Sequence, residues 1–182
     1  MKSLKIIQVL CNIGKIFSKI VFICCIVGAS LCLVGILSLA LGIETIVING
    51  QTIGSIIENN SNMSMGTMYN TMTGTIVLAS GEAVVAKFAE KYFQNELTDG
   101  TPLTLRGAKE IRRLGILQIA ISLGTTIIAS IIQAIFVHSL ENVKETSFDN
   151  GSTIVLGIMF LVLSLVMQYA SEELAKKEEK TE

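Results

Sequence analysis

Three groups of side chains in this 182-residue chain are of types that could bind a ligand or move a proton. They are an acidic residue within an apolar stretch, a methionine cluster and a basic cluster: Glu82; Met63, Met65, Met68 and Met72; Arg106, Lys109, Arg112 and Arg113. None of them matches a Ser/His/Asp set, a zinc-ligand spacing or a glycine-rich phosphate loop. We therefore predict no enzymatic activity, no catalytic residues and no cofactor.

Glu82 is of interest because an ionisable group within a membrane-spanning segment is costly and is a functional candidate by default. A carboxylate at such a position could relay protons or bind a cation. The alternative is that Glu82 lies near the inner interface, where its neighbour Lys87 is only five residues away, and simply reaches toward the headgroups.

Met63, Met65 and Met68 follow a Met-x-Met-x-x-Met pattern around the start of the second apolar stretch, and Met72 comes four residues later. Thioethers are soft ligands that select Cu(I). Methionine is also a general filler of irregular gaps. We predict no metal site and retain Met63, Met65, Met68 and Met72 as the candidates if soft metal is bound.

The basic cluster places Arg106, Lys109 and Arg113 on one helical face at positions i, i+3 and i+7. Such a face could dock an acidic partner or anionic lipid headgroups. The alternative is that these cations only fix the orientation of the chain in the membrane, which requires no partner.

The composition indicates a membrane protein. Of the residues, 51% are hydrophobic and only 16% are charged, and the net charge of −1 gives no reason to expect direct binding to nucleic acid. Four stretches approach or exceed the ~20 apolar residues that a spanning helix needs. We predict the spans at 16–42, 67–88, 114–137 and 153–170.

The hydropathy of residues 67–88 is low for a membrane-spanning helix. The distribution of Lys and Arg nevertheless indicates that this segment crosses the membrane. If residues 67–88 did not cross, the basic cluster would lie on the same side as the first loop, which has no Lys or Arg. The positive-inside rule disfavours that arrangement. We therefore predict that both termini, the loop 89–113 and the tail 171–182 are cytoplasmic.

The first loop contains a hairpin signal, Asn49-Gly50 between two β-branched runs. The predicted fold is thus an all-α, integral membrane four-helix bundle in one domain, residues 1–182, with a small extracytoplasmic β-hairpin. In the first span, small residues recur at Cys25, Gly28, Cys32 and Gly35, a stripe that favours close helix packing and permits a homo-oligomer.

Two short motifs resemble a known family. Gly100-Thr-Pro-Leu-Thr104 is followed by Ala108-Lys-Glu-Ile-Arg-Arg-Leu-Gly115, and the fourth span ends in Gln168-Tyr-Ala-Ser-Glu-Glu-Leu174. In this layout the chain resembles the YoaS-like proteins, small four-span bacterial membrane proteins of unknown function. The resemblance implies no catalytic residues. It suggests a partner, since members are often encoded beside a small helix-turn-helix regulator.

The sequence thus predicts a multi-pass protein of the bacterial cytoplasmic membrane, with the lipid bilayer as its first partner. The predicted function is regulatory or sensory, with a small transcriptional regulator bound at the cytoplasmic face. The alternative is a small transport or soft-metal-handling protein that uses Glu82 and the Met63–Met72 cluster.

Overall fold

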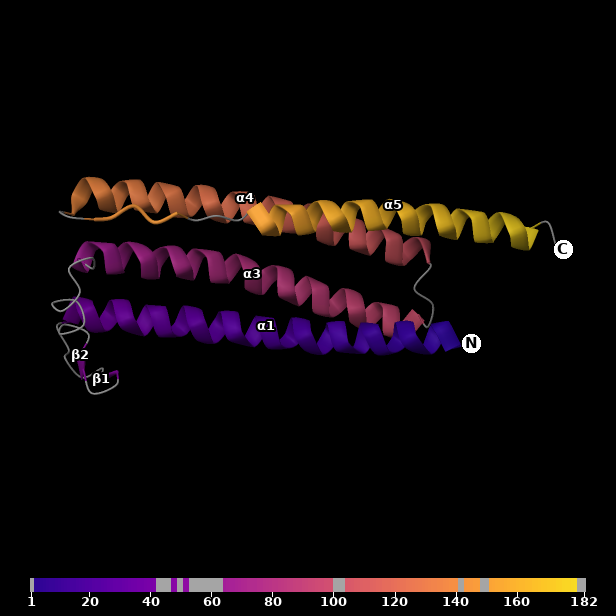
Figure 1. Cartoon of the computed structure of the whole chain (residues 1–182), viewed down its shortest axis with the longest axis horizontal. Helices are drawn as coiled ribbons and strands as arrows, with labels where there is room; N and C mark the ends of the chain where they lie inside the picture. The colour runs from indigo at the N-terminus through magenta and orange to yellow at the C-terminus, as the bar shows by residue number, and fades with distance from the viewer. Residues whose placement is uncertain are drawn as a thin grey trace. The chain divides into compact units, whose positions relative to one another are not determined.

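The computed structural model describes residues 2–41, 47–48, 51–52, 64–99, 104–140, 143–147 and 151–179. This part of the chain contains helices α1 (Lys2–Leu41), α3 (Met65–Asp99), α4 (Leu105–Ser139) and α5 (Gly151–Glu179), labelled in Figure 1. It also contains strands β1 (Val47–Ile48) and β2 (Gln51–Thr52).

The helices confirm the predicted all-α fold with membrane-crossing segments. Among the described residues, four helices are long and apolar enough to span a bilayer: Ile7–Leu41, Met65–Thr98, Leu105–Ser139 and Gly151–Glu173. A helix rises ~1.5 Å per residue, so 35 residues reach ~50 Å, well beyond a hydrocarbon core of ~30 Å. Three of these helices therefore have turns to spare outside the core.

The strands β1 and β2 pair antiparallel, with Val47 opposite Thr52 and Ile48 opposite Gln51. This ladder of two residue pairs is the whole β structure of the described residues. Asn49 and Gly50, on which the hairpin prediction rested, lie outside the described residues.

Two helix starts are fixed by side-chain caps. The backbone N–H of Gly107 donates to Thr104 Oγ1 over 3.0 Å at the start of α4, and that of Thr67 donates to Ser64 Oγ over 3.1 Å at the start of α3. An N-cap hydroxyl satisfies one of the amides that have no partner within the helix. Thr104 and Ser64 are therefore the N-caps of α4 and α3.

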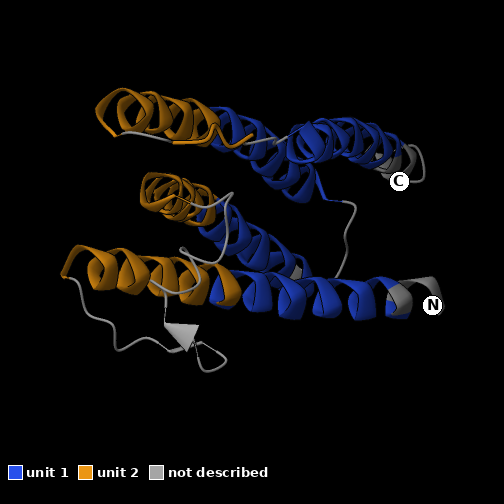
Figure 2. Ribbon diagram, turned by 60° about the vertical axis from the view of Figure 1, so that its left-hand side comes forward, with its two compact units in different colours: residues 1–23, 82–123, 150–182 blue, residues 24–81, 124–149 orange. Residues whose placement is uncertain are grey.

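The chain divides into two compact units, coloured separately in Figure 2. Unit 1 comprises residues 1–23, 82–123 and 150–182, and unit 2 comprises residues 24–81 and 124–149. The prediction of a single membrane domain stays a prediction.

Unit 1 contains parts of all four helices. Its core is formed by Ala108, Ile111 and Met167, with Tyr92 and Phe160 packed against them. Gly157 of α5 meets Gly115 of α4 so closely that a Cβ built on Gly115 would lie 2.8 Å from the Gly157 carbonyl oxygen. The two helix backbones thus touch, as small residues allow in membrane helices.

Several polar side chains of α4 and α5 are buried. Gln118 and Ser122 of α4 are both 2% exposed, and Ser164 of α5 is 1% exposed. Ser130 of α4 is exposed and departs from this pattern. The outward surface of the same helices is apolar, with Ile127, Ile131 and Val162 all more than half exposed. A bilayer is the solvent that suits this inside-out distribution.

In unit 2, the small-residue stripe of α1 is used at only one of its two glycines. A Cβ on Gly35 would lie 3.0 Å from Met72 Cε, so that glycine accommodates a methionine of α3. A Cβ on Gly28 would meet nothing within 4 Å. Close packing is confirmed at Gly35 and is not found at Gly28.

Candidate functional site

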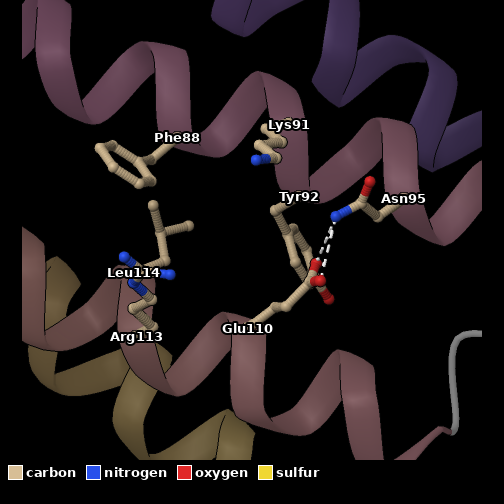
Figure 3. Close-up of a pocket in the computed structure, with 7 residues that line it drawn as sticks. All are labelled: Phe88, Lys91, Tyr92, Asn95, Glu110, Arg113 and Leu114. Carbon is tan, nitrogen blue, oxygen red and sulfur yellow. Dashed lines mark hydrogen bonds between the residues drawn. The ribbon is translucent and has the colours of Figure 1, made fainter.

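The candidate site lies where the end of α3 and the start of α4 face each other in unit 1. Figure 3 shows Phe88, Lys91, Tyr92 and Asn95 of α3 opposite Glu110, Arg113 and Leu114 of α4. These seven residues line a pocket of about 110 Å³. A space of this size can admit water but is too small for a drug-sized ligand.

One side-chain pair ties the two helices together. Asn95 Nδ2 donates to both carboxylate oxygens of Glu110, at 3.0 Å to Oε1 and 2.9 Å to Oε2. Arg106 Nε, one turn before Glu110, lies 3.3 Å from Glu110 Oε1. Hydrogen bonds to a charged acceptor are roughly twice as strong as neutral ones. Glu110 therefore bonds both Asn95 of α3 and Arg106 of its own helix.

A second contact between the helices involves Glu96 and Gly107. Glu96 is only 4% exposed, and a Cβ built on Gly107 would overlap the Glu96 carboxylate. Gly107 therefore makes room for a buried acidic side chain. Sequence reasoning identified neither Asn95, Glu96 nor Glu110, because each is an ordinary polar residue of an apparently solvated helix.

The four predicted basic residues have different environments. Lys109 and Arg112 are exposed. Arg106 is also exposed but is paired with Glu110. The guanidinium of Arg113 lies 5.6 Å from the centroid of the Phe88 ring, within cation–π range. The structure thus brings Arg106 and Arg113 to the α3–α4 junction and leaves Lys109 and Arg112 on its outer surface.

Glu82 lies elsewhere in unit 1, half-buried on the wall of a second pocket of about 330 Å³. Its expected neighbour, Lys87, is directed to another acidic residue. Lys87 Nζ is 2.8 Å from Glu90 Oε2 and 5.4 Å from the centroid of the Phe22 ring. Lys87 is therefore bonded to Glu90, and the position of Glu82 near the inner interface stays a prediction.

The methionine cluster is only partly described, since Met63 lies outside the described residues. Met65 is 50% exposed, and Met72 packs against Gly35 of α1. Filling the space above a glycine is the ordinary packing role of methionine. The geometry of Met72 is thus that of a gap-filler.

A polar network in unit 2 was not anticipated. Asn70, fully buried at 0% exposure, donates from Nδ2 to Gln133 Oε1 over 3.4 Å. The same Gln133 oxygen accepts the backbone N–H of Thr146 at 3.2 Å, and Thr67 Oγ1 accepts the backbone N–H of Lys144 at 3.0 Å. Side chains of α3 and α4 therefore accept hydrogen bonds from two backbone amides of the non-helical segment 143–147.

Comparison of the chain with models of protein families, with curated proteins and with solved structures finds no match. The resemblance to the YoaS-like proteins accordingly stays a prediction, resting on the two motifs described above.

Proposed function

We propose that this chain is a non-enzymatic regulatory or sensory protein of the bacterial cytoplasmic membrane. Its working surface is the exposed side of the α3–α4 hairpin, together with the C-terminal tail. The observation that supports this most is the exposure of Lys109 and Arg112 on a helix start that is capped by Thr104 and tied to α3 through Asn95 and Glu110. A cationic surface held in place by fixed helices loses little conformational entropy when it binds an acidic partner.

The suggested partner, a small helix-turn-helix regulator, comes from the resemblance to the YoaS-like proteins. Reversing both exposed charges, Lys109→Glu with Arg112→Glu, is expected to abolish capture of such a regulator. The reason is that like charges placed across an interface cost several kcal/mol. The measurement is crosslinking of the tagged protein in native membranes, followed by mass spectrometry of the proteins recovered.

The matched control is Lys144→Glu, a charge reversal at an exposed lysine of unit 2. It should leave the recovered partner unchanged. Equal recovery of the regulator with the Lys109/Arg112 variant and with the control would show that the basic surface is not the docking site.

The proposed topology places both termini and the α3–α4 hairpin in the cytoplasm, and strands β1 and β2 outside. Its support is the distribution of charge between the units. Of the fourteen Lys and Arg residues, all except Lys144 fall in unit 1. Cations concentrate on the cytoplasmic side of membrane proteins.

Cysteine labelling tests this topology. In a chain whose four native cysteines are replaced by alanine, Lys144→Cys is expected to react with a membrane-impermeant maleimide added to intact cells. Lys109→Cys should react only after the membrane is permeabilised. The reverse pattern would invert the topology, and labelling of both positions in intact cells would contradict it.

A second candidate function, small-molecule transport, is favoured by one observation, the position of Glu82 on the wall of the 330 Å³ pocket. The Met72 contact with Gly35 gives no comparable support to soft-metal handling. A transporter should lose its activity on Glu82→Gln and tolerate charge reversal at Lys109 and Arg112, whereas a regulator should show the opposite behaviour.

A further inference from the structure

The pocket that contains Glu82 lies within unit 1 and is bounded by α1, α3, α4 and α5. Its volume of about 330 Å³ is at the lower end of the range for small-molecule sites, roughly 300–1,000 Å³. Pockets between the helices of bundles are common places for ligands. The chemistry of the lining therefore decides what this pocket could hold.

The lining is apolar except at a few positions. Its polar members are Glu82, Ser18, Gln118 and Thr153, and Glu82 is the charged one among the described residues of the wall. The nearest lysine along α3, Lys87, is bonded to Glu90 at 2.8 Å and does not line the pocket. A carboxylate in apolar surroundings either takes up a proton or is stabilised by a positive partner, so a cation bound in the pocket would favour the ionised form of Glu82.

Three helices each contribute a phenylalanine to the wall: Phe17 from α1, Phe93 from α3 and Phe160 from α5. The ring of Phe93 is held against α1, because a Cβ on Gly14 would lie 2.7 Å from its Cζ. Aromatic faces attract cations through the negative side of the ring quadrupole, and cages of such rings recognise quaternary ammonium groups. The carboxylate and the rings therefore favour the same kind of ligand.

We propose that this pocket binds an apolar monocation of the quaternary ammonium or phosphonium class. A divalent metal ion is disfavoured, because Mg²⁺ and Ca²⁺ require several oxygen ligands and the wall offers a single carboxylate. A hydrophilic cation is disfavoured by the aliphatic and aromatic remainder of the lining. The inference goes beyond the regulatory function and does not depend on it.

The test is equilibrium dialysis of the full-length protein, in a mild detergent, against radiolabelled tetraphenylphosphonium. Saturable binding to the unmodified chain is expected. Glu82→Gln should weaken phosphonium binding at least about tenfold, because the amide removes the negative charge that attracts the cation while keeping the shape of the side chain. The matched control is Glu90→Gln, the same change on the same helix outside the pocket wall, and its affinity should be unchanged.

A neutral competitor distinguishes a cation-binding site from a nonspecific apolar pocket. Triphenylphosphine oxide should fail to displace the phosphonium. Displacement at equal concentration, or a Glu82→Gln affinity equal to that of the unmodified chain, would overturn the proposal in favour of an acyl-chain pocket. Absence of saturable binding to the unmodified chain would also overturn it.

A second variant keeps the test decisive if Glu82→Gln does not fold. Phe17 is 65% exposed, so Phe17→Leu should leave the bundle intact while removing one aromatic face. Phosphonium affinity should fall about threefold, in line with one cation–π contact. An unchanged affinity in this variant would overturn the proposal, because the aromatic ring would then not contact the bound cation.

Discussion

Replacing Gly115 by alanine is expected to destabilise the protein by about 1–3 kcal/mol, the usual penalty for inserting a methyl group where there is no space. The new Cβ would lie 2.8 Å from the Gly157 carbonyl oxygen and 3.1 Å from Phe160 Cβ. The carbonyl belongs to the backbone of α5, so relief requires the two helices to move apart. The measurement is the midpoint of unfolding by sodium dodecyl sulfate, followed by circular dichroism in mixed micelles.

The same substitution at Gly124, on the same helix, provides the control. A Cβ there would meet nothing within 4 Å. Since alanine is favoured over glycine in helices by up to ~1 kcal/mol, Gly124→Ala should be neutral or stabilising. Opposite signs at the two glycines are therefore expected. A Gly115→Ala chain as stable as the unmodified one would mean that α4 and α5 do not touch at this point.

Replacing Asn95 by leucine is expected to cost about 1.5–3 kcal/mol, the range for hydrogen bonds to charged groups. The change removes the two contacts of Asn95 Nδ2 with the Glu110 carboxylate and leaves that carboxylate with Arg106. The Glu110 side chain is 27% exposed, so solvent screening places the expected loss toward the lower end. Detergent unfolding, measured as for the glycine variants, reports the change.

A double-mutant cycle isolates the Asn95–Glu110 contact. Asn95→Leu combined with Glu110→Leu should be less destabilising than the sum of the two single changes, because each single change already removes the shared bonds. Gln94→Leu, at the exposed neighbouring position of α3, is the control for added surface hydrophobicity and should have little effect. Strictly additive losses of unfolding free energy in the cycle would show that Asn95 and Glu110 do not stabilise the packing of α3 against α4.

The features that the sequence predicted well depend on local chemistry. Apolar stretches of sufficient length predicted the four helices. Gln118 and Ser122 are four residues apart, the spacing of one helical face, and both are buried. These features depend on contacts within one helix or with the bilayer, so the neighbouring residues in the sequence are enough to predict them.

The features that the sequence did not predict depend on how far one helix is shifted along another. Asn95 contacts Glu110 only because α3 and α4 pack with one particular axial offset. A helical period specifies which residues share a face and does not specify that offset. The 143–147 segment is held by Thr67 and Gln133, residues far from it in the chain or on the preceding helix.

The contact of Gly157 with Gly115 also bears on the bilayer itself. Gly115 lies at the start of the charge-free part of α4, just beyond Arg112 and Arg113, whereas Gly157 is well inside the apolar part of α5. The exposed side chains of Leu163 and Val166 therefore continue along α5 past the level at which α4 becomes cationic. A difference of this kind between neighbouring helices is a hydrophobic mismatch, which tilt, local changes in bilayer thickness or snorkelling of the cationic side chains can accommodate. Each adjustment carries a modest cost, so we expect the chain length of the surrounding lipids to influence the stability of this helix pair.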